Sequence, residues 1–255
     1  MIVEYHRPDN LPEAIRLLNR KEIKTVPLGG GSVINTPSIE RFAVVDLQDL
    51  GLNQIQVKGN YLNVGATLTL QSLLDAQELP VDLPVVIRHE AAYNLRQVAT
   101  VAGALVSADG RSPFATALLA LDAQVTLAPE NVQAGLGDIF LQRTQGLHGR
   151  IITTIHIPRN ARLSYDYVAR TPADLPIVCI AAAAWPSGRI RLAAGGFGDA
   201  PALVLDGPEA GGVELAARDA YHDASDQWAS SDYRREVAAV LAQRCIKSLF
   251  TGADN

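Results

Sequence analysis

The sequence predicts an α+β fold built from three consecutive segments. A small βα unit occupies the start of the chain, an alternating hairpin pattern opens the next segment, and a polar break precedes a final run of strands and a helical tail. These three observations place the segments at residues 1–55, 56–160 and 161–255. A chain of 255 residues is long enough for such a division.

The first segment is predicted to contain a helix followed by two strands. Asn10 has the position of an N-cap, with a proline in the first turn and Glu13 at the capping-box position. Residues 24–28 have a short strand pattern that runs into a glycine-rich turn. Residues 42–46 are almost entirely apolar, as expected for a strand that is covered on both faces.

The second segment is expected to begin with an antiparallel hairpin. Apolar and polar residues alternate over residues 53–66, on either side of Lys58-Gly-Asn60. The other elements expected here are a helix capped by Thr69, a helix over residues 83–93, a helix that starts at Ser112 and Pro113, and strands over residues 123–127 and 150–157.

The third segment follows the polar residues 158–162. Strand patterns cover residues 163–169, 177–185 and 189–194, and a helical pattern ends the chain. The charged stretch Asp232-Tyr-Arg-Arg-Glu236 is interpreted as the exposed start of that last helix.

Composition and charge exclude several classes of protein. The net charge of -5 at pH 7 argues against a nucleic-acid partner, because phosphate binding needs a surplus of Lys and Arg on one face. No apolar run approaches the ~18 residues that span a membrane, and the first residues lack the pattern of a signal peptide. We therefore expect a cytoplasmic protein without a membrane span.

No residue pattern in the sequence points to catalysis or to a metal site. Cys179 and Cys245 lack C-x-x-C spacing and lie in apolar stretches, so we expect both in the core. The histidines show no metal-ligand spacing, and His156 is expected to have a structural role in its strand. Nucleophile-elbow, zincin and P-loop motifs are missing. Any chemistry would therefore belong to a bound cofactor.

Two runs of small residues form the candidate binding site. Small residues let a backbone approach a ligand closely, and consecutive amides in a turn can point at an anion. We expect the amides of residues 29–33 and 103–107 to hold a diphosphate from two sides, although the first run alone also fits an ordinary tight turn. Asp109 and Ser112 are assigned to a ribose or adenine edge, with turn and cap chemistry as the alternative. The candidate residues are Leu28, Gly29, Gly30, Gly31, Ser32, Val33, Thr100, Gly103, Ala104, Ser107, Asp109 and Ser112.

The order of these motifs resembles the flavin subunits of the molybdenum hydroxylase family, such as the carbon monoxide dehydrogenase medium chain and the xanthine dehydrogenase flavin domain. Pro27-Leu-Gly-Gly-Gly-Ser-Val-Ile34 is similar to the family's first flavin loop. Val64-Gly-Ala-Thr-Leu-Thr69 and Asn94-Leu-Arg-Gln-Val-Ala-Thr-Val-Ala-Gly103 resemble two further flavin-domain segments. Three later segments resemble landmarks of the family's C-terminal domain, namely Arg170-Thr-Pro-Ala-Asp174, Ala194-Gly-Gly196 and Ser231-Asp-Tyr-Arg234.

The resemblance implies a fold, a cofactor and partners. Residues 1–55 and 56–160 would be two αβ subdomains of an FAD-binding fold, the second with a mainly antiparallel sheet, and residues 161–255 would be a C-terminal domain of a short antiparallel sheet and helices. FAD would lie between the first two, with its diphosphate against both glycine loops. Electrons would pass from a molybdenum-cofactor large subunit through a [2Fe-2S] small subunit to FAD, and then to NAD or a quinone. The chain would be an oxidoreductase subunit whose activity needs these partners.

The sequence departs from the family pattern at two places. The second loop usually reads Gly-Gly-Asn in the family, whereas this chain has Ala102-Gly103-Ala104, and Pro113 replaces a usual acidic residue. The alternative is therefore a structural subunit of the same fold with weak or absent flavin binding. A stand-alone flavin reductase of the cell-wall precursor type shares the FAD-binding architecture, but no serine or glutamate acid is placed as its chemistry requires.

Overall fold

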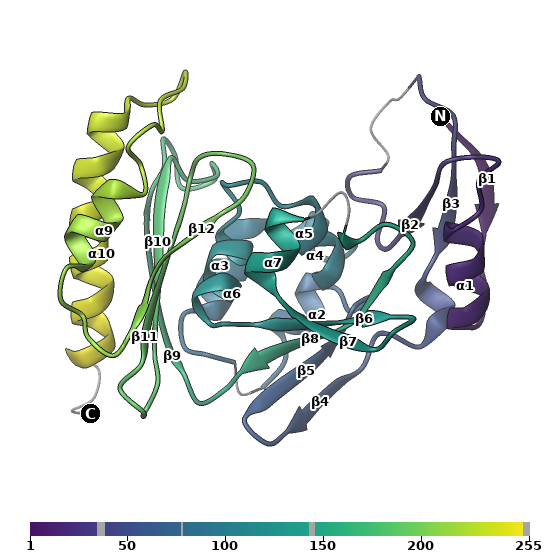
Figure 1. The fold of residues 1–255 in the computed structure, drawn as a ribbon, viewed down its shortest axis with the longest axis horizontal. Coiled ribbons are helices and arrows are strands. Elements are labelled where there is room, and N and C mark those ends of the chain that lie inside the picture. Colours follow the sequence, from purple (N-terminus) through teal and green to yellow (C-terminus); the bar gives the residue numbers. More distant parts are fainter. Residues whose placement is uncertain (35–38, 78, 143–145, 252–255) are drawn as a thin grey trace. The chain divides into compact units, whose positions relative to one another are not determined.

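A computed structural model describes residues 1–34, 39–77, 79–142 and 146–251 and confirms an α+β fold (Figure 1). The chain forms two compact units, and neither is continuous in sequence. The first unit contains residues 1–76, 93–107 and 124–156, and the second contains residues 77–92, 108–123 and 157–255. The division into three consecutive segments remains a prediction. The boundaries of the two units differ from it in the assignment of two helices. The helices at 83–90 and 113–120 belong to the same unit as the C-terminal sheet.

The first unit begins with a parallel three-stranded sheet. Its strand order is β1 (Ile2–His6), β3 (Phe42–Asp46) and β2 (Thr25–Leu28). Helix α1 (Leu11–Leu18) starts as predicted, because the side chain of Asn10 accepts a hydrogen bond from the backbone N–H of Glu13 at 2.9 Å. The sequence did not predict β1, whose residues are mixed in polarity.

A five-stranded sheet completes the first unit. Its order is β4 (Ile55–Lys58), β5 (Tyr61–Gly65), β8 (Ile151–Pro158), β6 (Gln124–Ala128) and β7 (Val132–Gly135). The pairs β4–β5, β6–β7 and β6–β8 are antiparallel, so the expected hairpin and the mainly antiparallel sheet are both confirmed. The helices of this unit's second part are α2 (Leu70–Leu74), α4 (Tyr93–Arg96), α5 (Val101–Ser107) and α7 (Leu136–Leu141).

The second unit contains a four-stranded antiparallel sheet between helices. Its order is β12 (Ala202–Gly207), β11 (Ile190–Gly195), β10 (Val178–Ala184) and β9 (Arg162–Val168). Helices α9 (Val213–Asp219) and α10 (Ser231–Thr251) cover one face, and α3 (Leu83–Glu90) and α6 (Pro113–Ala120) lie on the other (Figure 1). The two central strands, β10 and β11, are buried along all or almost all of their length, which agrees with cover on both faces.

The predicted structural residues of this unit lie where the sequence placed them, with one exception. Cys179 and Cys245 are buried free thiols, and burial raises the pKa of each to about 12. The interpretation of residues 232–236 as an exposed helix start is wrong for Arg234, which is fully buried. The helical pattern around it is correct, but the pattern alone did not show that this arginine points inward.

Candidate functional site

The first glycine run and the second small-residue run meet in the first unit, as the sequence predicted. A Cβ atom added to Gly30 would lie 1.5 Å from the carbonyl oxygen of Val98. A Cβ on Gly29 would lie 2.6 Å from the hydroxyl of Thr100, and one on Gly103 would lie 2.7 Å from the same hydroxyl. Both glycine-bearing segments therefore touch Thr100, and the absence of side chains allows the two backbones to approach one another.

The second run does not form the expected turn. Residues 101–107 form helix α5, and the backbone N–H of Gly103 donates to Thr100 Oγ1 at 3.1 Å, as at a capped helix start. The N–H of Ala104 donates to the carbonyl of Thr100 at 2.8 Å. The donors of Gly103 and Ala104 are therefore used by the helix and its cap in this conformation, and the expected diphosphate contacts of residues 103–107 remain a prediction.

Three amides of the first run remain available as donors. The structure gives the backbone N–H groups of Gly30, Gly31 and Ser32 no hydrogen bond to another described residue. Gly31 has a φ of 72°, in the left-handed region that favours glycine, so the chain turns sharply at this point. Successive amides at such a turn suit an anion. The expected phosphate contacts of this run remain a prediction.

A cavity of about 750 Å³ lies beside both runs. Its volume is in the upper part of the range of cofactor and small-molecule pockets. The predicted residues that line it are Gly29, Gly30, Gly31, Ser32, Val33, Thr100, Gly103 and Ser107. Leu28 and Ala104 are not among the described lining residues.

Asp109 and Ser112 belong to the second unit and make local bonds there. Asp109 accepts a hydrogen bond from the backbone N–H of Arg111 at 2.8 Å. Ser112 caps α6 by accepting from the N–H of Ala115 at 3.0 Å, and its hydroxyl donates to Glu90 at 2.8 Å. These contacts agree with the turn-and-cap alternative, while a role toward a nucleotide stays a prediction.

The cavity also contains residues that sequence reasoning did not select. Thr67 lines it, and its hydroxyl is buried without a hydrogen-bond partner among the described residues. Ala66 and Ala102 line it too, and the N–H of Ala102 donates to the carbonyl of Ala66 at 3.2 Å. The resemblance of residues 64–69 to a flavin-domain segment of the family was the one sequence signal that could have identified Ala66 and Thr67 as lining residues. An unpaired hydroxyl in a cavity of this size fits a polar cofactor such as FAD.

Two cations at the cavity are paired with carboxylates. Arg20 Nη2 lies 2.5 Å from Glu4 Oε2, and Lys24 Nζ lies 2.8 Å from Glu40 Oε2. The hydrogen bond from Lys24 lowers the pKa of Glu40 below its ordinary value. An anion entering the cavity would meet positive charge that is already partly balanced, so backbone dipoles and polar side chains carry more of its recognition.

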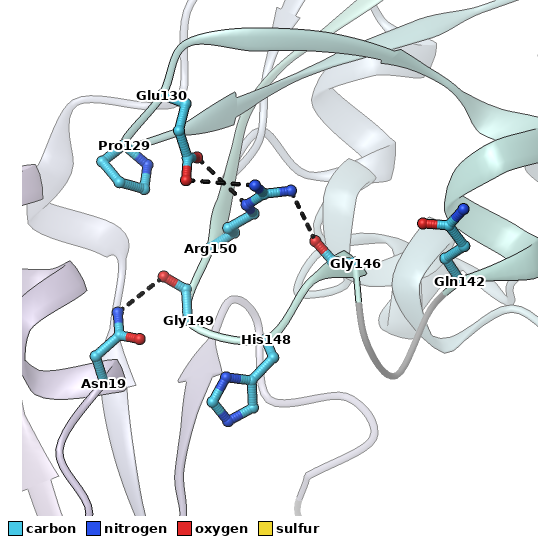
Figure 2. Close-up of a pocket in the computed structure, with 8 residues that line it drawn as sticks. All are labelled: Asn19, Pro129, Glu130, Gln142, Gly146, His148, Gly149 and Arg150. Atoms are coloured by element: carbon cyan, nitrogen blue, oxygen red, sulfur yellow. Dashed lines mark hydrogen bonds and ion pairs between the residues drawn. The ribbon is translucent and has the colours of Figure 1, made fainter.

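A second, more polar pocket of about 550 Å³ lies around Arg150 in the same unit (Figure 2). Arg150 Nε lies 3.3 Å from Glu130 Oε2, and Asn19 donates to the carbonyl of Gly149 at 3.1 Å. These groups satisfy one another across the pocket, as the dashed lines in Figure 2 show. His148, Gly149 and Arg150 also line the larger cavity, so this network fixes one of that cavity's walls.

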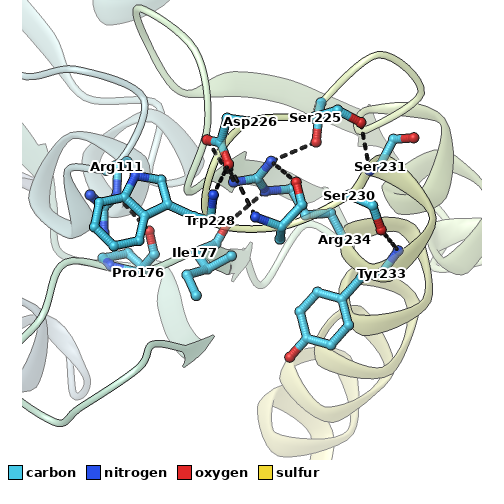
Figure 3. A network of polar contacts seen from close by, with 12 residues as sticks. Arg111, Pro176, Ile177, Ser225, Asp226, Trp228, Ser230, Ser231, Tyr233 and Arg234 are labelled. Atoms are coloured by element: carbon cyan, nitrogen blue, oxygen red, sulfur yellow. Dashed lines mark hydrogen bonds and ion pairs between the residues drawn. The ribbon is translucent and has the colours of Figure 1, made fainter.

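A buried arginine, Arg234, connects several segments of the second unit through hydrogen bonds (Figure 3). Arg234 makes two 2.8 Å bonds to the carboxylate of Asp226 and donates to the carbonyls of Ile177, Ala224 and Ala229. Five donated bonds match the five N–H groups of a guanidinium. The family landmark that ends at residue 234 therefore has a structural role in this unit.

Within the residues that the structure describes, no cluster of His, Cys, Asp and Glu is suited to hold a metal ion. In the same part of the chain, none of the helices combines the length and apolar character needed to cross a bilayer.

Comparisons with known proteins agree with the sequence motifs. Residues 1–160 match the family model described as the FAD binding domain in molybdopterin dehydrogenase. The chain is 28% identical over 254 residues to the uncharacterized protein YgfM of Escherichia coli K12, and the match covers 94% of each chain. It is 24% identical to the carbon monoxide dehydrogenase medium chain of Afipia carboxidovorans, over 99% of this chain and 98% of the relative.

A solved structure has the same fold. The carbon monoxide dehydrogenase from Hydrogenophaga pseudoflava includes a chain that superposes with a TM-score of 0.82, at 18% identity, over 98% of both chains. The similarity in fold therefore extends beyond residues 1–160 of the family match and includes the C-terminal part of the second unit.

Proposed function

The chain belongs to the family of FAD-binding domains in molybdopterin dehydrogenases, and from this premise we propose that it is the FAD-carrying electron-transfer subunit of a multi-subunit molybdenum hydroxylase. The observation that carries the proposal is the cavity lined by the glycine run of residues 29–33 and by Thr100 and Gly103. Its relatives include a carbon monoxide dehydrogenase medium chain, and the match covers 98% of that relative. We therefore assign it a molybdenum-cofactor large subunit and a [2Fe-2S] small subunit as partners.

The residues of the chain bind and orient, whereas bound FAD supplies the redox chemistry. The free amides of Gly30, Gly31 and Ser32 would hold an anionic group of the cofactor, and Thr100 lies against both glycine segments. The chain needs no nucleophile or general base for this role, and the partner subunit that carries molybdenum selects the substrate. The electron acceptor is NAD or a quinone.

One observation favours the alternative of a structural subunit that binds flavin weakly. Helix α5 uses the amides that the second run was expected to offer, so the first run alone supplies backbone donors to a diphosphate. The family's usual asparagine is Ala104 here, which removes one more polar group. Under this alternative the fold and the docking surfaces are kept and the cofactor is lost.

Purification of the tagged chain from its own cells separates the two functions. We expect a yellow complex with a flavin spectrum, together with a large molybdenum-cofactor subunit and a small cysteine-rich subunit. Mixing the reduced complex with NAD⁺ or with a soluble quinone then identifies the acceptor by the rate of flavin reoxidation. A colourless complex with the same two partners would support the structural subunit, and recovery of the chain alone with full activity on a substrate would refute both.

A further inference from the structure

Thr67 is a buried residue whose hydroxyl lacks a partner. Its side chain is 3% exposed, and Oγ1 has no hydrogen bond among the residues that the structure describes. The backbone N–H of the same residue is satisfied, because it donates to the carbonyl of Leu52 at 2.9 Å. Buried hydroxyl groups are hydrogen-bonded in the large majority of cases, so this exception needs an explanation.

The backbone around Thr67 is held in place by hydrogen bonds. The N–H of Ala66 donates to the carbonyl of Thr153 at 3.1 Å, and the carbonyl of Ala66 accepts from the N–H of Ala102 at 3.2 Å. One residue further on, the carbonyl of Leu68 accepts from the N–H of Val101 at 2.8 Å. Residues 66–68 are thus held from both sides, and a backbone shift toward a protein partner for the hydroxyl would break these bonds.

The missing partner can come from the cavity. Thr67 lines the cavity of about 750 Å³. Its neighbours in the wall, Ala66 and Ala102, have side chains without polar atoms. A hydroxyl both donates and accepts, so it suits a ring nitrogen, a carbonyl, a hydroxyl or a phosphate oxygen equally well.

We propose that Thr67 Oγ1 hydrogen-bonds a polar atom of bound FAD, and that Thr67 is a cofactor-positioning residue. This inference rests on the proposed placement of FAD in the cavity. It has an unusual consequence, because the hydroxyl destabilises the empty protein and stabilises the loaded one. Stability of the apoprotein and affinity for FAD should then respond to its removal in opposite directions.

The test replaces Thr67 with valine, which keeps the branched shape and removes the hydroxyl. The matched control is Thr126→Val in β6, where the hydroxyl is bonded to His156 Nε2 at 2.7 Å and is not among the cavity-lining groups. Thermal denaturation of the apoprotein and FAD titration by flavin fluorescence quenching are measured for both variants, for Thr67→Ser and for the unaltered protein.

Thr67→Val should melt at the same or a higher temperature than the unaltered apoprotein and bind FAD about three- to tenfold more weakly, the range of one net hydrogen bond. Thr67→Ser should restore the affinity. Thr126→Val should melt at a lower temperature and bind FAD within about twofold of the unaltered protein.

Unchanged FAD affinity in Thr67→Val would overturn the inference and leave the proposed function intact. A lower melting temperature for Thr67→Val, similar to that of the control, would also overturn it, because the hydroxyl would then have a partner in the protein. Failure of the unaltered protein to bind FAD would refute the FAD-carrying function and this inference with it.

Discussion

Replacing Gly30 with alanine should destabilise the protein even when no cofactor is bound. The added Cβ atom would lie 1.5 Å from the carbonyl oxygen of Val98. A carbon and an oxygen in contact lie about 3.3–3.6 Å apart, so one of the two backbones must move by roughly 2 Å. Overpacking of this kind costs about 1–3 kcal/mol. A loss of about 2 kcal/mol in a chain of this size lowers the melting temperature by roughly 4–8 °C.

The affinity for FAD should fall as well, because the glycine segment that lines the cavity is displaced. We expect at least a tenfold loss, which corresponds to about 1.4 kcal/mol. The assay is thermal denaturation of the apoprotein, followed by FAD titration of the folded variant. Gly207→Ala is the matched control, since a Cβ at that position meets no atom within 4 Å.

A second glycine variant, Gly103→Ala, tests whether the loss of stability follows the severity of the steric clash. Gly103→Ala should cost less than Gly30→Ala, because its Cβ meets the hydroxyl of Thr100 at 2.7 Å, and a side chain can rotate away more easily than a backbone can move. If Gly30→Ala leaves the apoprotein's melting temperature unchanged and only weakens FAD binding, then Gly30 makes room for the ligand and the steric argument is refuted.

Three further predictions concern the second unit. Arg234→Met should lower the free energy of unfolding by about 3–5 kcal/mol, measured in urea, because it strands the carboxylate of Asp226 and the carbonyls that the guanidinium serves; a loss below about 1 kcal/mol would contradict this role. Burial raises the pKa of Glu90 in the folded protein above its value in the unfolded chain. The stability that this carboxyl contributes is therefore complete at a pH below the unfolded-state pKa, and it is lost as the pH rises through the folded-state pKa. Glu90→Gln should therefore lose less stability than the unaltered protein across that pH window, and parallel pH profiles would show that the burial argument is wrong. A chain that ends at Arg159 should aggregate, because α6 is buried along its whole length in the unit that would lose its sheet; a soluble, cooperatively melting fragment would refute this.

Local chemistry made much of the fold predictable. The caps at Asn10, Thr69 and Ser112 are all present, because each side chain accepts a hydrogen bond from the amide three residues on. The hairpin at Lys58-Gly-Asn60 was visible in the alternation of its strands. Strands β1, β7 and β12 were missed, since no residue in any of them is buried, and such strands carry little apolar periodicity.

The proximity of the two small-residue segments was predictable, whereas their backbone conformations were not. Small residues marked both segments that line the cavity, and the fold brings them together. A run of small residues has no property that distinguishes a turn from a helix start, so the second run was assigned the wrong backbone. Thr67 and the inward direction of Arg234 depend on neighbours that are distant in sequence, and no local pattern reports them.

The alternation of the two units along the chain also constrains the order in which the protein forms during synthesis. The first unit lacks β8 until the ribosome has passed residue 156, and helices α3 and α6 emerge long before the sheet that buries them. Long-range pairing of this kind slows folding. The apolar surface of α6 stays uncovered while the rest of the chain is made, which is the condition under which nascent chains recruit chaperones. The first unit, which holds the cavity, is complete once β8 has been made, whereas α6 is covered only after β9–β12 follow, so the two units are expected to fold one after the other.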